Sequence, residues 1–260
     1  MTLTPSLKHK AITSIAWNSI DKFVVQGIAF VISIILARIL MPADYGLIGM
    51  LAIFLAFSEL FVGSGFSMAL IQKSDRTDVD YSTIFHFNLV IGIISYTILF
   101  LSAPLIAQFF HAPQLVPLAR ILSLSIIINS LSIVQQTRLS IQLDFKTQAI
   151  ISLVAVATSG LIGILLAYKG FGVWSLVGQI LSAASIKTIS LFCFNKWVPL
   201  ITFNISSFKQ LFSFSSNILG ASLIASIVNN LYSILIGKMF TVRDLGYYTK
   251  ARQYPEVISS

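Results

Sequence analysis

Long apolar runs recur along the whole chain, and they constrain its fold more than any other feature. Each run reaches the roughly 18 residues that let an α-helix cross a bilayer. Of the 260 residues, 56% are apolar and only 10% are charged, so a water-soluble domain could not keep this much apolar surface from water. The sequence therefore predicts an all-α, polytopic helical membrane protein.

Proline, glycine and charged residues divide these runs into seven predicted helices. The connection at 195–210 is the longest between the later helices, and its Trp197 and basic residues suit a segment at the membrane interface. The predicted helices lie at about 17–40, 45–66, 83–110, 118–141, 149–168, 173–194 and 212–237.

Lysine and arginine residues near the helix ends predict the orientation. The net charge is +8, but the basic residues lie between the helices rather than in one patch, so we expect no nucleic-acid partner. With the N-terminus in the cytoplasm, eight of these residues fall on the cytoplasmic side and five outside. The cytoplasmic set is Lys8, Lys10, Lys73, Arg76, Arg138, Lys146, Lys196 and Lys209, and the external set is Arg38, Arg120, Lys169, Lys238 and Arg243.

A short motif occurs twice, 200 positions apart. The stretch LARILMPADYGLIGM at 36–50 returns more faintly as IGKMFTVRDLGYYTK at 236–250, and the aspartate and glycine align. In the second copy, Thr241 and Asp244 form a T-x-x-D arrangement that can cap the next helix. In the first copy, Pro42 suits the first helical turn, where no backbone donor is lost.

Two interpretations of this motif stay open. It is either a common joint between two helices or the mark of a parallel repeat of six-helix halves, as in alternating-access transporters. Under the second interpretation the chain holds one six-helix bundle plus the first helix of a second bundle. The expected units are the bundle at 1–194, an interfacial linker at 195–211, and the first helix and start of the next at 212–260, and a longer native protein is expected.

Several stretches occur in an order that resembles the bacterial polysaccharide flippases, which share a superfamily with the MATE drug exporters. They are LARILMPADYGLIGM at 36–50, LFVGSGFSMALIQ at 60–72, LDF at 143–145, GFGVWSLVGQ at 170–179 and LGYYTKARQYP at 245–255. The version with LDF and GFGVW looks closest to exporters of colanic-acid-type exopolysaccharide. Met41 departs from the family, which often has a capping serine there.

The resemblance implies two six-helix bundles around a cavity that opens alternately to cytoplasm and periplasm. The expected cargo is an undecaprenyl-diphosphate-linked oligosaccharide repeat unit, flipped across the bacterial inner membrane for surface polysaccharide synthesis. Membrane lipids and the glycan polymerase machinery are the expected partners. No enzymatic activity, metal or cofactor is expected, and a proton or sodium gradient is the candidate energy source.

A path for sugars must be lined by polar groups, because such groups are costly in hydrocarbon. Four predicted helices carry polar residues at helical spacing, which places them on one face. The alternative is that serine and asparagine hydrogen-bond neighbouring helices. The uncharged candidates for the cavity are Gln26, Asn129, Gln136, Gln179, Asn217 and Asn229.

Charged residues inside the predicted helices are stronger candidates for functional roles, because a charge in hydrocarbon is costly. Glu59 lies well within an apolar helix, and Asp21 lies in the first, so each carboxylate should face protein or water and could bind the coupling ion. Their alternative role is a structural ion pair. For the diphosphate, Lys22, Arg138 and Lys187 are the candidate cations, and their alternative is to reach the membrane interface.

Two other functions compete with the flippase. A drug or cation exporter of the same superfamily would favour acidic cavity residues, whereas the intramembrane charges here are mostly basic. A membrane glycan ligase or polymerase would need catalytic groups in a sizeable external loop, and the predicted external loops at 41–45, 111–117 and 169–172 are short. A non-transporting helical scaffold is a third alternative, which the polar faces disfavour.

Overall fold

The structure is a computed structural model that describes residues 23–63 and 65–259, apart from the side chains of 214, 217 and 253–259. Every regular element in this part of the chain is a helix, which confirms the predicted fold class. The helices are Phe23–Ile39, α2 (Pro42–Gly63), α3 (Phe66–Gln72), α4 (Asp78–Phe109), α5 (Leu115–Leu122), α6 (Leu124–Ile141), α7 (Phe145–Tyr168), α8 (Val173–Asn195), α9 (Ile205–Met239) and α10 (Val242–Ser259).

Six helical segments among the described residues are long and apolar enough to cross a membrane. Two of them are interrupted, since α2 continues into α3 and α5 continues into α6. The helix Phe23–Ile39 is apolar but shorter, and it is the described part of the first predicted helix. The chain is therefore a multi-pass membrane protein, and each of the seven predicted helices is present.

Several helices begin earlier than the apolar pattern predicted, and the differences are largest for α4 and α9. The start of α4 at Asp78 precedes the predicted start by five residues, because Thr77 and Asp80 form a reciprocal capping box at 2.8 and 3.3 Å. The start of α9 at Ile205 precedes its prediction by seven residues. There the Asn204 side chain accepts hydrogen bonds from the backbone N–H groups of the first turn. Polar caps extend both helices beyond their apolar parts.

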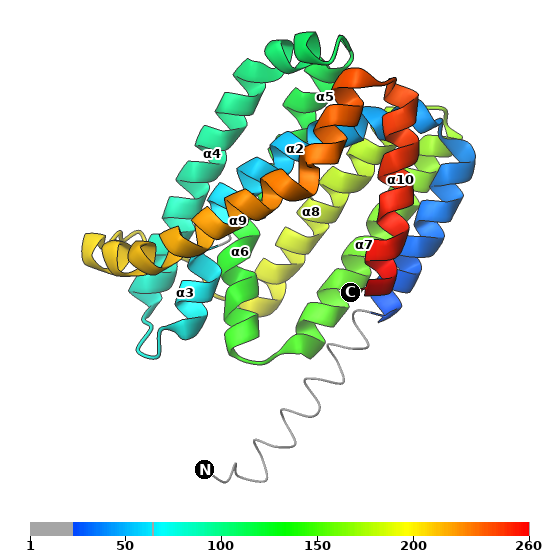
Figure 1. The fold of residues 1–260 in the computed structure, drawn as a ribbon. Coiled ribbons are helices and arrows are strands. Elements are labelled where there is room, and N and C mark those ends of the chain that lie inside the picture. Colours follow the sequence, from blue (N-terminus) through cyan, green and yellow to red (C-terminus); the bar gives the residue numbers. More distant parts are fainter. Residues whose placement is uncertain (1–22, 64, 260) are drawn as a thin grey trace.

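Two apolar clusters hold the helices together at opposite ends of the bundle (Figure 1). The larger cluster joins α2, α4, α5, α6, α8 and α10 near the ends of α4 and α9, and Leu115, Leu122 and Ile126 are fully buried in it. The smaller cluster joins α3, α4, α6 and the start of α9 around Phe66 and Leu70. Between the two clusters, α9 crosses the face of the bundle diagonally, and α10 runs back along its side (Figure 1).

The connection 196–204 is fastened to the start of α4. The indole N–H of Trp197 donates to Asp78 Oδ1 at 3.1 Å. The backbone N–H groups of Leu200 and Asn204 donate to hydroxyls in the first turns of α4, at 2.9 and 3.1 Å. This extended segment therefore fixes the position from which α9 leaves the bundle.

The two copies of the repeated motif form matching corners, as the sequence predicted. In the second copy, Asp244 Oδ2 accepts hydrogen bonds from the backbone N–H and the hydroxyl of Thr241, at 3.1 and 2.6 Å. In the first copy, Asp44 Oδ2 accepts from the backbone N–H of Met41 at 3.0 Å, and Pro42 is the first helical residue. Met41 has no hydroxyl, so this corner has one hydrogen bond fewer.

The two corners also pack against each other through their glycines. A Cβ atom on Gly46 would lie 2.8 Å from the carbonyl carbon of Val242, and one on Gly246 would lie 2.6 Å from the carbonyl carbon of Pro42. The contact is reciprocal, because the glycine of each corner lies against the backbone of the other corner. From this contact α2 and α10 diverge (Figure 1). We call it the glycine crossing.

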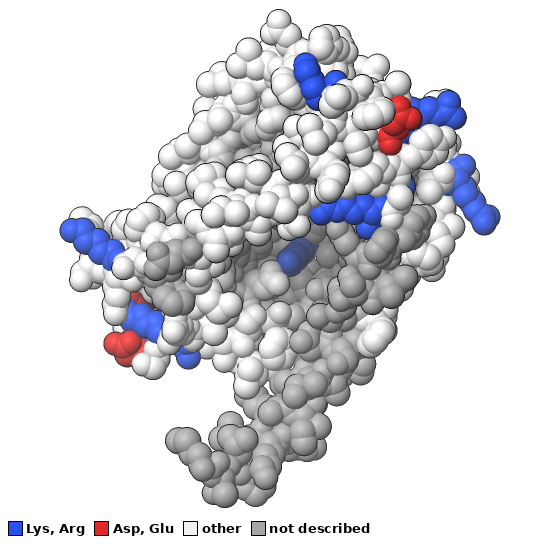
Figure 2. All heavy atoms as spheres, in the orientation of Figure 1, with Lys and Arg blue, Asp and Glu red and all other residues white. Residues whose placement is uncertain are grey.

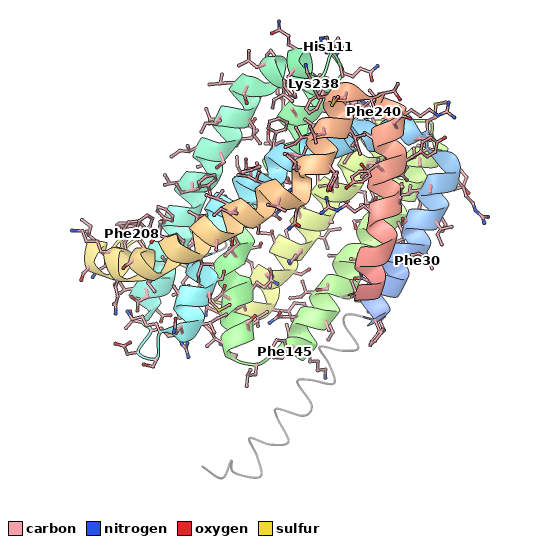
Figure 3. The ribbon with its side chains drawn as sticks, viewed as in Figure 1. Phe30, His111, Phe145, Phe208, Lys238 and Phe240 are labelled. Atoms are coloured by element: carbon pink, nitrogen blue, oxygen red, sulfur yellow. The ribbon has the colours of Figure 1, made fainter. Side chains whose placement is uncertain are left out.

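The side chain of Lys238 stabilises the end of the molecule that contains the glycine crossing. Lys238 Nζ donates to the carbonyl of Phe109, the last residue of α4, at 2.7 Å, and it lies 4.3 Å from the centroid of the Phe109 ring. A cation at a helix C-terminus satisfies free carbonyls and complements the helix dipole. Figure 3 shows Lys238 beside Phe240 and His111 at this end. As a repeated cation next to a helix end, Lys238 was expected to anchor that end, and this contact makes it a helix anchor.

The glycine crossing predicts a specific sensitivity to one methyl group. In Gly246→Ala, the new Cβ meets backbone rather than a movable side chain, so α10 must shift away from α2. We expect a loss of about 1 to 3 kcal/mol of stability, typical of overpacking, seen as a lower Tm in detergent. Gly220→Ala on α9 is the matched control, because nothing lies within 4 Å of its Cβ position. Equal Tm values for the two variants would contradict the close packing.

Candidate functional site

A cavity of about 610 Å³ lies between the first bundle and the two helices that follow it. Its wall is built from the helix Phe23–Ile39, α2, α7 and α8 on one side, and from α9 and α10 on the other. On the face drawn in Figure 2, the surface is hollowed below α9 and beside α10, and a basic side chain is visible inside. The glycine crossing closes the cavity at one end, because Gly49 and Thr249 line it directly beyond that contact.

The wall combines small apolar residues with polar groups from the helix Phe23–Ile39, α7, α8, α9 and α10. Alanines of α2 and α8 leave room, while hydroxyl and amide groups offer hydrogen bonds to a polar occupant. The polar and basic lining residues are Ser33, Ser159, Gln179, Asn230, Ser233, Thr249, Lys250 and Arg252. The described part of the cavity wall contains no aspartate or glutamate, so its electrostatic character is cationic.

The two cations of the wall, Lys250 and Arg252, both come from α10. Lys250 Nζ donates to the Ser33 hydroxyl at 2.8 Å and lies 4.1 Å from the centroid of the Tyr45 ring. Arg252 Nη1 donates to the backbone carbonyl of Asn229 on α9 at 2.6 Å. These contacts are with neutral groups of the wall, and the two cations together suit the binding of an anion.

Among the residues predicted from the sequence, Gln179 lines the cavity. Its side chain passes close to Gly163 of α7, where a Cβ would lie 3.1 Å from Gln179 Cβ. The polar face predicted on the seventh helix also reaches the wall, through Asn230 and Ser233. Asn229 itself is exposed, and it takes part through the carbonyl that binds Arg252.

Three other predicted residues come together outside this cavity. Asn129 Nδ2 of α6 donates to Glu59 Oε1 of α2 at 2.9 Å. The ammonium of Lys187 on α8 interacts electrostatically with the same carboxylate. From the sequence, Glu59 was a candidate to bind the coupling ion, Lys187 a candidate to bind the diphosphate, and Asn129 a candidate to line the cavity. In the structure the three residues form one polar cluster across α2, α6 and α8. Glu59 therefore faces protein partners rather than lipid alone.

Arg138 helps to hold the connection 196–204 against the start of α4. Its guanidinium carbon lies 5.1 Å from the centroid of the Tyr81 ring and 4.9 Å from that of the Trp197 ring, and Arg138 Nη1 lies 3.7 Å from Asp78 Oδ1. These contacts place it between the start of α4 and the end of α6. It is not among the residues that line the cavity.

The remaining candidates are less informative. Gln136 and Gln26 are half-buried and do not line the cavity. Lys22, Asp21 and the side chain of Asn217 lie outside the described residues. Of the serines on the fourth predicted helix, several donate to carbonyls of their own helix; they are Ser125, Ser130, Ser132 and Ser140.

Lys250 and Arg252 were not predicted from the sequence, although a signal for them existed. The 200-residue offset aligns Thr249 with Gly49 and Arg252 with Ala52, and all four residues line the cavity. If the alignment of the two motif copies is extended beyond residue 250, Arg252 aligns with Ala52. Because Ala52 lines the cavity, this alignment would have predicted Arg252 as a cavity residue. Lys250 aligns with Met50, which is buried in the larger apolar cluster, so its place in the wall depends on how α10 diverges.

Comparisons with known proteins agree on one family. Residues 35–260 match the family model described as "Polysaccharide biosynthesis protein". The succinoglycan biosynthesis transport protein ExoT of Rhizobium meliloti is 27% identical over 256 residues, which are 98% of this chain and 52% of that protein. The teichuronic acid biosynthesis protein TuaB of Bacillus subtilis is 28% identical over 251 residues, 96% of this chain and 52% of that protein.

A third relative and a solved structure complete the comparison. The lipopolysaccharide biosynthesis protein WzxC of Escherichia coli is 23% identical over 95% of this chain and 50% of that protein. The chain thus spans about half the length of the curated relatives that it matches. A multidrug resistance MATE family transporter, solved in an inward-facing conformation, matches 94% of this chain and 61% of its own with a TM-score of 0.61 and 18% identity, which shows the shared fold.

The cavity predicts which residues of α8 meet water in a membrane. In a Cys193→Ser background, Ala183→Cys places a thiol on the cavity wall, whereas Ile189→Cys places one on an exposed, apolar position of the same helix that should face lipid. We expect a membrane-impermeant maleimide to label the first variant at least about 10-fold faster, since thiolates form in water and not in hydrocarbon. Equal labelling of both would mean that the cavity is dry.

Proposed function

The chain belongs to the polysaccharide biosynthesis protein family, and we propose that it forms part of a flippase for a polyprenyl-diphosphate-linked oligosaccharide. The cargo would move from the cytoplasmic to the periplasmic leaflet of a bacterial inner membrane, for surface polysaccharide synthesis. The observation that carries this proposal is a cationic, polar cavity inside a bundle of membrane-spanning helices.

Physical chemistry explains why such a cavity suits this cargo. A diphosphate and its sugars cannot pass through hydrocarbon unaided, because unpaired polar and charged groups are costly there. Lys250 and Arg252 offer two cations for the diphosphate, and the hydroxyl and amide groups of the wall offer hydrogen bonds for sugars. The polyprenyl tail would stay in the surrounding lipid.

The relatives support the same class of cargo. The names of the three relatives refer to succinoglycan, teichuronic acid and lipopolysaccharide, which are all surface glycans, and the first is named as a transport protein. Transport by binding and conformational change requires no catalytic group, so we propose a transporter rather than an enzyme. Membrane lipids and the glycan polymerase machinery are its proposed partners.

The orientation follows from the distribution of basic residues. With the N-terminus in the cytoplasm, the corners at 41–46 and 241–246 lie on the periplasmic side. The glycine crossing then closes the periplasmic end, and the cavity would receive cargo from the cytoplasmic leaflet. We propose that this arrangement is the loading state of an alternating-access cycle.

A cation or drug exporter is the second candidate, because the solved structure that shares the fold is a multidrug transporter. Such a cargo would call for carboxylates in the wall. Among the described lining residues the charged side chains are instead Lys250 and Arg252, which favour an anionic cargo. A membrane glycan ligase or polymerase is less supported, because the relatives and the fold point to transport.

Deletion of the full-length gene tests the proposal in the cell. We expect lipid-linked repeat units to accumulate in the cytoplasmic leaflet and surface glycan to disappear, because the repeat units can no longer cross the membrane to be polymerised. A plasmid copy of the gene should restore both. Lipid extraction with leaflet-selective labelling and staining of surface glycan provide the measurements. Normal surface glycan in the deletion strain would contradict the flippase assignment.

The cluster of Glu59, Asn129 and Lys187 is the proposed site of ion coupling, by a proton or a sodium ion. In Glu59→Gln, the amide oxygen can still accept the hydrogen bond from Asn129, but the charge is removed. We expect gradient-driven transport to fall by about 10-fold or more, which corresponds to about 1.4 kcal/mol. Asp75→Asn, in an exposed loop, is the control carboxylate. Unchanged dependence on the ion gradient would remove Glu59 from the coupling mechanism.

A further inference from the structure

Lys250 lies where the cavity meets the glycine crossing. It follows Gly246 by one helical turn, so the two residues share a face of α10. Its ammonium binds the Ser33 hydroxyl on the helix Phe23–Ile39 and lies over the Tyr45 ring on α2. One side chain of the second repeat therefore contacts two helices of the first bundle.

The neighbours of Lys250 on α10 make the rest of this contact. Thr249 packs on Gly49, where a Cβ would lie 2.6 Å from the threonine hydroxyl oxygen. Leu245 is completely buried, and it reaches both Gly49 and Gly237. A displacement of α10 from α2 would therefore expose Leu245 before most other core residues.

Lys250 could replace its contacts with the Ser33 hydroxyl and the Tyr45 ring by stronger contacts with an anion. A hydroxyl and an aromatic ring are neutral partners, whereas a diphosphate is a multiply charged anion that forms charge-assisted hydrogen bonds. Because Lys250 also lines the cavity, an anionic head group there could bind the same ammonium. Movement of the ammonium toward an anion deeper in the cavity would lengthen its contacts with Ser33 and the Tyr45 ring.

We propose that Lys250 couples the arrival of cargo to the opening of the glycine crossing. An anionic lipid head group in the cavity draws the ammonium away from Ser33 and Tyr45, and α10 then separates from α2 at the closed end. Arg252 keeps its contact with the Asn229 carbonyl, so the cargo retains a second cation while the crossing opens. This inference rests on the proposed function, since it needs an anionic cargo.

The test uses a thiol at the buried position Leu245, in a Cys193→Ser background and in the full-length protein in lipid nanodiscs. The rate of maleimide labelling of Leu245→Cys reports how often the crossing opens. The probes are undecaprenyl diphosphate and the neutral undecaprenol. With Lys250 present, we expect slow labelling alone or with undecaprenol, and labelling about 10-fold faster with the diphosphate, a factor equivalent to ~1.4 kcal/mol.

The variants distinguish coupling from a general effect on the fold. Lys250→Gln should label fast with or without the diphosphate, because its contacts no longer hold the crossing closed. Lys250→Arg keeps the charge and should restore the response, which shows that the reporter protein still folds. Arg243→Gln, which removes an exposed cation at the start of the same helix, should behave as the parent.

The outcomes separate this inference from the proposed function. If the parent binds undecaprenyl diphosphate but labels at the same rate with and without it, the coupling is overturned and the cargo assignment stands. The same holds if Lys250→Gln labels slowly and responds like the parent. If the parent does not bind undecaprenyl diphosphate at all, measured by native mass spectrometry of the nanodisc complex, the proposed cargo fails and the coupling fails with it.

Discussion

The close approach of α2 and α10 at Gly46 and Gly246 is the contact on which the rest of the structure depends. Any side chain at these positions would meet the backbone of the other helix, so only glycine lets the two corners interlock. Because α2 and α10 touch at one end and then diverge, a cavity remains between them. The contact that brings the two helices together at one end thus leaves a cavity beyond it.

The membrane sets the second constraint, since polar groups must find partners away from lipid. The structure meets it in three separate places. The connection 196–204 is satisfied by hydroxyls and carboxylates at the start of α4, Glu59 is satisfied by Asn129, and the cations of α10 are satisfied within the cavity wall. These polar sites are separate in the structure, so each satisfies its own polar groups.

The sequence was sufficient for features that depend on nearby residues. Apolar runs predicted the helices, and the corners at Pro42 and Thr241–Asp244 were predicted from turn chemistry. The caps at Thr77 and Asn204 follow the same rules, but the starts of α4 and α9 were predicted from apolar periodicity alone and were therefore placed too late.

Contacts between distant residues were beyond such reasoning. Arg138 was proposed for the diphosphate because it is a cation near a polar face, but its rings and carboxylate come from segments about 60 residues away on either side. Lys250 and Arg252 were missed because their role depends on how α10 leaves the glycine crossing, which no local pattern encodes. Transport of a defined cargo by the purified full-length protein tests the central claim most directly. In proteoliposomes, the account predicts movement of a fluorescent undecaprenyl-diphosphate glycan between leaflets and no movement of a cationic dye, whereas transport of the dye alone would contradict it.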